Sequence, residues 1–200
     1  MTDTHVDICF QRASSELRVN ETLTDVLYEA FGEVGRPLPD AKSEALARDL
    51  YATLPVEALG VTERKAKILY GDEGRKAAEA FRDEVLLTNL YPRHVTGMTY
   101  WASTDVGDVS FCKPLGFLHV SCLVKDVPLH TWQAVAFGKS SFAMEGMLTA
   151  AKVIGAAGIR LCEEPLLALK AKQEWEEQNR LEPYVCPLPE EAKPEGTVQK

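Results

Sequence analysis

Two carboxylates near the middle of the chain have a spacing that suits metal binding or acid–base chemistry. Asp105 and Asp108 stand three residues apart on either side of Gly107, in a stretch typical of a loop before a short apolar run. Paired carboxylates can hold a divalent metal or divide the roles of acid and base. Aspartate is equally common in turns, where it bonds the local backbone. The pair therefore leaves both interpretations open.

A histidine is the second candidate. His130 follows Pro128 and Leu129 in a loop between an apolar run at 117–124 and a long helix expected after Ser140. Binding sites in open α/β sheets lie in loops at strand ends, and neutral imidazole is a good zinc ligand. A lone histidine is also a common surface or structural residue, so its position alone does not assign it.

Three further residues are candidates for a substrate pocket. Lys139 and Ser140 stand where the long helix begins, and free backbone N–H groups beside a lysine can bind a carboxylate or a phosphate. Helix capping by the serine explains the same residues without a ligand. Trp132 lies beside the histidine loop and could form the wall of a pocket for a flat substrate, or only pack against its neighbours.

Composition and charge exclude several classes of protein. The 200 residues are 46% hydrophobic and 26% charged, which is typical of one globular domain. The net charge of −8 argues against a nucleic-acid or anionic-membrane partner. No uninterrupted apolar run reaches the roughly 18 residues of a membrane span, and the N-terminal sequence lacks the features of a secretory signal. The five widely spaced cysteines suit a cytoplasmic protein with reduced thiols, although a cysteine-ligated zinc or a redox pair stays open.

Hydrophobic periodicity predicts alternating strands and helices. Apolar residues alternate at 5–10 and run continuously at 117–124, which predicts a half-buried and a buried strand, with a shorter strand at 109–112. Apolar spacings of three and four predict several helices, whose expected N-caps are Asn20, Asp40 and Ser140. Strands separated by helices indicate the α/β class, with a mixed sheet flanked by helices.

Three motifs occur in an order that resembles a known enzyme family. They are S-T-D-V-G-D-V-S at 103–110, P-L-H-T-W-Q at 128–133 and G-K-S-S at 138–141. Together they resemble the C-terminal part of two-metal amidohydrolases of the aminoacylase and carboxypeptidase G family, in the branch that includes aminobenzoyl-glutamate hydrolase. Segments 19–23 and 184–189 resemble the same branch, so the resemblance covers most of the chain.

The resemblance implies hydrolysis of an amide bond in an N-acyl amino acid of the aminobenzoyl-glutamate kind. In that family a metal-bound water attacks the amide carbonyl, with zinc or manganese as the metal and a glutamate as the general base. His130 matches the family's last metal ligand. The residues expected beside the ligands or the substrate are Asp105, Asp108, Trp132, Lys139 and Ser140.

The sequence departs from the family at the other metal ligands. No segment resembles the early histidine, the bridging aspartate or the adjacent glutamates that the family places in its N-terminal half. The resemblance therefore implies the C-terminal portion of a catalytic domain at 20–186, with a variable insertion at 56–98. Residues 1–19 are expected to be the remnant of a strand of the lid or dimerisation domain, and 187–200 a flexible tail.

Three interpretations of the function remain open at this point. The first is a hydrolase that takes its missing ligands from a second polypeptide equivalent to the N-terminal half. The second is a non-catalytic pseudoenzyme or interaction subunit that keeps the fold. The third is an unrelated α/β binding module whose motifs match by chance. The first two predict an unpaired sheet edge or apolar seam that binds an N-terminal-half polypeptide or forms a homo-oligomer.

Overall fold

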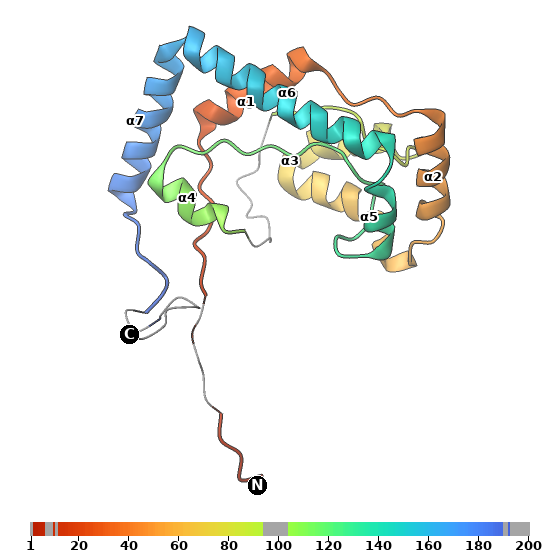
Figure 1. Ribbon diagram of the computed structural model, residues 1–200, viewed down its shortest axis with the longest axis horizontal. Coiled ribbons are helices and arrows are strands. Elements are labelled where there is room, and N and C mark those ends of the chain that lie inside the picture. Colours follow the sequence, from red (N-terminus) through yellow and green to blue (C-terminus); the bar gives the residue numbers. More distant parts are fainter. Residues whose placement is uncertain (1, 7–9, 11, 94–103, 190–191, 193–200) are drawn as a thin grey trace, which may run out of the picture.

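The computed structural model describes residues 2–6, 10, 12–93, 104–189 and 192, and the secondary structure of these residues is helical (Figure 1). Helix accounts for 58% of them, and none of them lies in a strand. The elements are α1 (Glu21–Val34), α2 (Ala41–Tyr51), the 3-10 helix η1 (Val56–Ala58), α3 (Val61–Ala80), α4 (Val106–Cys112), α5 (Trp132–Phe137), α6 (Ser141–Glu163) and α7 (Pro165–Leu181). The prediction of an α/β fold with a mixed sheet is therefore wrong.

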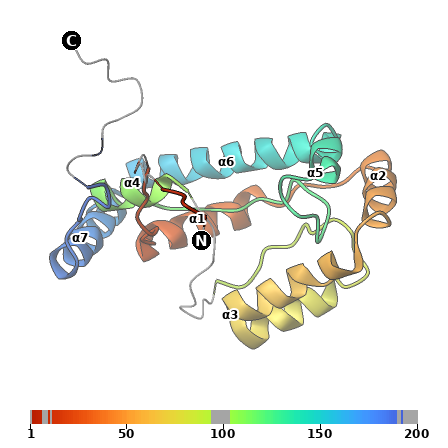
Figure 2. The ribbon, with the colours of Figure 1, turned by 90° about the horizontal axis from the view of Figure 1, so that it is seen from below.

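Two long helices, α1 and α6, lie side by side at the centre of the molecule (Figures 1 and 2). A buried cluster joins them, and its members are Val26, Ala30, Val153 and Ala157. At one end of this pair α7 packs on both helices, and at the other end α2 packs on α5. A second buried cluster fills that other end, with members Ala47, Leu50, Val85, Leu86, Val124, Phe137 and Phe142.

The predicted helix starts are confirmed. The side chains of Asn20, Asp40 and Ser140 accept hydrogen bonds from backbone N–H groups three residues further on, and so cap α1, α2 and α6. α1 ends before Gly35, whose φ of 83° lies in the left-handed region that glycine adopts without strain. These signals are readable from the sequence because each cap involves residues within a single helical turn.

The run at 109–112, which we predicted to be a strand, forms the second half of α4. The buried side of this helix packs directly on the N-terminal segment, because a Cβ on Gly107 would lie 1.9 Å from the carbonyl oxygen of Ser15. Ser110 is buried on the same side, while Val109 is 49% exposed. A run of four residues fits helix and strand patterns equally well, and the packing against distant segments selects the helix.

The apolar run at 117–124 contains no regular secondary structure and pairs with no strand in the described part of the chain. It crosses α1 and α6 instead, since a Cβ on Gly116 would lie 2.7 Å from Leu27 Cδ1, and one on Gly146 would lie 2.3 Å from the Ser121 carbonyl oxygen. An apolar run predicts that a segment is buried, but it does not predict which elements bury it. Here helices α1 and α6 do so, and not neighbouring strands. Of the strand predicted at 5–10, residues 7–9 lie outside the description, and the other three have no regular secondary structure.

α3 is a hairpin of two short helices. At Gly71 φ is 62° and ψ is −145°, which reverses the direction of the chain. A Cβ on Gly74 would lie 2.3 Å from the carbonyl oxygen of Ala66, so the backbones of the two halves are in direct contact. Both ends of the hairpin therefore lie at the same side of the molecule.

α6 is the most apolar long helix of the structure. It has 23 residues, and the mean hydropathy of its most apolar window is 1.3, with 33% of that window buried. By length and composition alone it passes for a membrane span, as core helices of soluble proteins also do. In the structure one side of α6 packs on α1.

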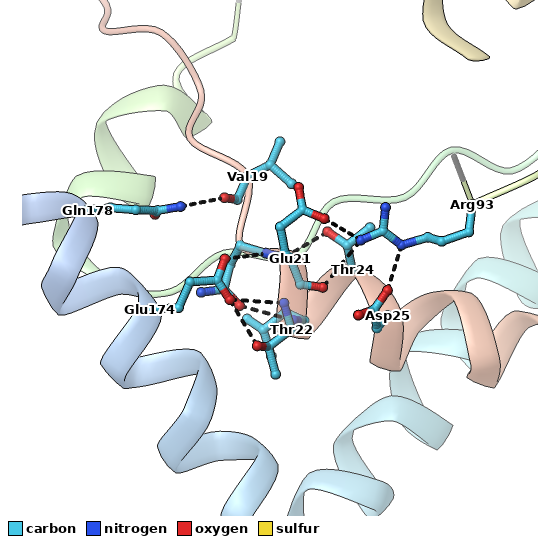
Figure 3. Close-up of polar contacts among 10 residues, drawn as sticks. Val19, Glu21, Thr22, Thr24, Asp25, Arg93, Glu174 and Gln178 are labelled. Carbon is cyan, nitrogen blue, oxygen red and sulfur yellow. Dashed lines mark hydrogen bonds and ion pairs between the residues drawn. The ribbon is translucent and has the colours of Figure 1, made fainter. Parts of the chain in front are cut away.

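Side chains of α7 complete the N-terminus of α1 (Figure 3). The Glu174 carboxylate accepts hydrogen bonds from the backbone N–H groups of Glu21 (2.5 Å) and Thr22 (3.0 Å), and from the Thr22 hydroxyl (2.9 Å). Asn20 Nδ2 donates to the carbonyl oxygen of Ala171 at 2.9 Å. Glu174 thus places a negative charge at the positive end of the helix dipole, and it links residues more than 150 positions apart.

Replacing Glu174 by alanine tests how much this carboxylate stabilises the N-terminus of α1. We expect the free energy of unfolding to fall by about 1–2 kcal/mol, because two backbone N–H groups lose a charged acceptor at a partly exposed site. Urea denaturation followed by circular dichroism measures the change. Glu177→Ala removes an exposed carboxylate from the same helix and is the matched control. An equal decrease in the free energy of unfolding of both variants would contradict this role of Glu174.

Candidate functional site

His130 lies in an exposed turn directly before α5. Its φ of 65° is in the left-handed region, where histidine is enriched among the few non-glycine residues found there. The turn is fixed on both sides of the histidine, because the Thr131 hydroxyl donates to the Pro128 carbonyl (2.8 Å) and accepts from the Ala134 N–H (3.4 Å). The geometry presents an accessible imidazole on an anchored backbone.

An apolar surface surrounds this turn. Leu129, Trp132 and Val135 are 67%, 60% and 70% exposed. Trp132 and Val135 stand three residues apart, so they share one face of α5. The structure therefore brings two of the predicted site residues, His130 and Trp132, to the same exposed end of α5, where a flat apolar group can bind.

The N-terminus of α6 is already occupied by groups of the chain itself. Ser140 is buried, and its hydroxyl caps the helix by accepting from the Ala143 N–H at 3.1 Å. The Asp40 carboxylate accepts a hydrogen bond from the Ser141 hydroxyl, which lowers the pKa of Asp40. An anion from outside would have to compete with Asp40. Lys139, just before the cap, is exposed and has no ion pair or hydrogen bond with a described residue.

A hollow of about 300 Å³ adjoins the same helix start. Its lining residues are Arg36, Leu38, Asp40, Ser141 and Glu145. The Arg36 guanidinium donates to Asn89 Oδ1 at 2.7 Å, and the hollow contains the carboxylates of Asp40 and Glu145 as well. Two acids against one arginine make this hollow unsuited to an anionic substrate.

Asp108 anchors two terminal segments to α4. Its Oδ1 atom accepts hydrogen bonds from the Ser15 hydroxyl (2.7 Å) and the Tyr184 hydroxyl (3.1 Å). The hydrogen bond from the Ser15 hydroxyl is the main reason why the pKa of Asp108 is lowered. The hydrogen bond from the Tyr184 hydroxyl lowers it further. Desolvation and the bond to Asp108 raise the pKa of Tyr184 to about 12. Asp105, directly before α4, is exposed and makes no cap.

The two aspartates do not share a site with His130 in this structure. α4 lies beside α7, because Trp175 Nε1 and Asn179 Nδ2 donate to the carbonyl oxygens of Ser110 (3.1 Å) and Phe111 (3.0 Å). α5, which follows His130, packs on α2 at the opposite end of the molecule (Figures 1 and 2). The predicted site residues thus fall into two separate groups.

The sequence analysis missed a buried pair of charged residues. Lys125 and Asp126 are 7% and 8% exposed. Asp126 accepts from the backbone N–H groups of Gly60 (2.8 Å) and Thr62 (2.7 Å) at the start of α3, while Lys125 Nζ donates to the Arg82 carbonyl (2.5 Å) just past its end. Each charge matches the helix-dipole end that it contacts. The signal in the sequence was a Lys-Asp pair at the end of an apolar run.

The described side chains show whether this chain alone could bind a metal ion. Among the residues that the structure describes, no three His, Cys, Asp or Glu side chains are grouped so that they could hold a metal ion. Zinc in proteins takes three or four protein ligands, and His130 supplies one. The described residues therefore do not form a metal centre by themselves.

Comparison with known proteins finds a relative longer than this chain. It is one of the subunits of the p-aminobenzoyl-glutamate hydrolase of Escherichia coli (strain K12), and it is 34% identical over 194 residues, which is 97% of the chain. The chain spans only 40% of the length of that protein. The resemblance drawn from the sequence motifs is confirmed, and the partial coverage fits a C-terminal portion. No family model and no solved structure matches the chain.

Ser15→Ala should raise the pKa of Asp108 toward its ordinary value, because the strongest hydrogen bond to that carboxylate is lost. A lowered carboxyl pKa stabilises the native contact above the ordinary value of 3.8 and loses that effect as the pH falls through the folded-state pKa. In the variant, Asp108 should therefore become protonated, and weaken its remaining hydrogen bond with the Tyr184 hydroxyl, at a higher pH than in the parent chain.

An NMR titration of the Asp108 carboxyl carbon measures the shift. Ser14→Ala, at the exposed neighbouring position, is the control and should leave the titration unchanged. An Asp108 pKa that is the same in all three proteins would show that the serine does not set it.

Proposed function

We propose that this chain forms part of a metal-dependent hydrolase that cleaves the amide bond of an N-acyl amino acid such as p-aminobenzoyl-glutamate. The observation that carries the proposal is the 34% identity to the E. coli p-aminobenzoyl-glutamate hydrolase protein, which extends over 97% of the chain. The chain matches 40% of that protein. The remaining catalytic groups would come from a polypeptide equivalent to the unmatched part of the E. coli protein, here called the complementary segment.

His130 is the residue that we assign to the metal, which is zinc or manganese. Its imidazole is exposed, and its backbone is anchored by Thr131 on the side of α5. A metal of this kind acts as a Lewis acid in amide hydrolysis. Because the described residues offer no further grouped ligands, the proposal requires the others from the complementary segment.

Trp132 and Lys139 are the residues that we assign to the substrate. The indole of Trp132, 60% exposed, offers a flat surface for an aromatic acyl group. The ammonium group of Lys139 has no described charged partner and suits a substrate carboxylate. Ser140 is committed to its cap and Asp108 to Ser15 and Tyr184, so neither belongs to the assigned pocket.

A non-catalytic interaction subunit is the second candidate function. The lack of a three-ligand group among the described residues favours it, since a chain that keeps its fold and loses its chemistry would look the same. The two candidates differ in what they require of His130. Only the hydrolase loses metal and activity when this side chain is removed.

A chimera tests the proposal. In it, this chain replaces the matched 40% of the E. coli protein. We expect the chimera to retain about two metal ions per chain, as two-metal hydrolases do, and to release p-aminobenzoate from p-aminobenzoyl-glutamate. The chain alone should retain no stoichiometric zinc, because it supplies one ligand. Elemental analysis after removal of free metal and a substrate assay give the two readouts.

His130→Ala in the chimera should lower both the metal content and the hydrolysis rate, the rate by roughly 100-fold or more. His119→Ala is the matched control, since His119 is also exposed but stacks edge-on against Phe117 at 4.9 Å. A folded chimera that hydrolyses the substrate equally well with either substitution would exclude His130 as a ligand. A folded chimera with neither metal nor activity would favour the interaction subunit.

A further inference from the structure

The outward side of α6 is an apolar face that the Glu145–Lys152 ion pair borders along one edge. Its buried side consists of Phe142, Gly146, Thr149, Val153 and Ala157, which recur at spacings of three and four. The opposite side repeats the same spacing with Met144, Met147, Leu148, Ala151, Ile154, Gly155, Gly158 and Ile159, and we call this set the outer α6 face. Met147, Ile154 and Ile159 are 57%, 57% and 61% exposed. A helix that is apolar on both sides is typical of one buried on both sides.

Two glycines on the outer α6 face lie against open space in the described structure. A Cβ on Gly155 or Gly158 would meet nothing within 4 Å. Gly146, on the buried side, is different, because a Cβ there would collide with the Ser121 carbonyl oxygen at 2.3 Å. Glycine is a poor helix former, and at these exposed positions it leaves room for close approach by another backbone. The outer face therefore combines large apolar side chains with room for another backbone.

The chain also buries few large side chains. Among the residues that the structure describes, eight of the 17 buried hydrophobic residues are alanine, whereas 24 large hydrophobic residues are exposed. Protein surfaces always contain some apolar atoms, but a continuous helix face of this kind marks an interaction site. What it lacks is an opposing apolar layer, since domains are built from layers that share one core.

We propose that the outer α6 face is the surface on which the complementary segment docks, an inference that rests on the proposed function. The relative aligns with 97% of this chain, and 60% of the relative, the remainder of its length beyond the 40% matched, has no counterpart here. The unmatched part of the relative is long enough to supply the apolar layer that the outer α6 face lacks. The occupant is accordingly a folded polypeptide that presents an apolar surface and comes closest to α6 over Gly155 and Gly158.

The charges around the face agree with a protein partner. Glu145 pairs with Lys152 at 3.5 Å, and Arg160 pairs with Glu164 at 3.2 Å and with Glu29 of α1. Glu145 and Lys152 border the apolar face and Arg160 lies on the side toward α1, and all of them are already paired within the chain. A polar rim around an apolar centre is the usual anatomy of a protein interface.

Hydroxyl-radical footprinting of the full chain, alone and co-expressed with the complementary segment of the E. coli protein, tests the proposal. Met144 and Met147 are native probes on the face, 46% and 57% exposed. We expect their oxidation to fall by roughly fivefold or more in the complex, because the centre of an interface excludes water. Tyr184, 42% exposed on the C-terminal segment, is the internal control and should react equally in both samples.

A pair of matched variants makes the test specific. Ile154→Asp on the face should weaken binding of the complementary segment by roughly 30-fold or more, as loss of a central apolar contact does. Leu169→Asp on α7 changes an equally exposed residue, 55% against 57%, and should leave binding unchanged. Circular dichroism of the free variants verifies that both fold.

Several outcomes would overturn the proposal. These are failure to recover a complex, unchanged oxidation of the two methionines in it, and equal effects of the two variants. Protection that grows with the concentration of the chain alone would assign the face to a second copy, and protection by phosphatidylcholine vesicles would assign it to a membrane. Hydrolysis and metal content measured on the same complex separate the two proposals, since protection without either would contradict only the proposed function.

Discussion

Long-range caps at helix ends hold this chain together. Glu174 of α7 caps α1, Asp126 caps the start of α3, and Ser141 of α6 bonds the Asp40 cap of α2. Helix ends leave backbone groups that need partners, and no sheet ladder links the segments within the described residues. The described core contains many alanines beside a few large side chains, so these polar contacts act together with apolar burial in fixing the helices relative to one another.

This dependence explains which parts of the fold the sequence could predict. The caps at Asn20, Asp40 and Ser140 act within one turn, so the helices that follow them were predicted correctly. The strands at 109–112 and 117–124 were wrong, because an apolar run reports that it is buried and not what buries it. A strand needs a neighbour to pair with, and periodicity in a single segment contains no information about that neighbour.

The candidate site residues also differ in whether their contacts are local or distant in sequence. His130 and Trp132 belong to one short motif, so the sequence alone predicts that they are close. In the structure both lie at the start of α5. Asp108 is distant in sequence from its partner Ser15, and a short-range pattern could not show that the carboxylate is already occupied. Lys125 and Asp126 were missed for the same reason, since each contacts an end of α3 more than 40 residues away.

Two features of this chain are incomplete in the same way, because each lacks groups that must come from outside the described residues. The site offers one exposed imidazole where a metal needs three or four protein ligands, and α6 offers a second apolar side where a monomer needs only one. A chain that evolved to work alone would gain stability by placing polar residues on the outer α6 face and by replacing its glycines with alanine. Met147, Ile154 and Gly158 remain there, at positions where nothing in the described chain requires them. The proposed complementary segment would supply both the missing ligands and the opposing apolar layer, which links the two proposals through one partner.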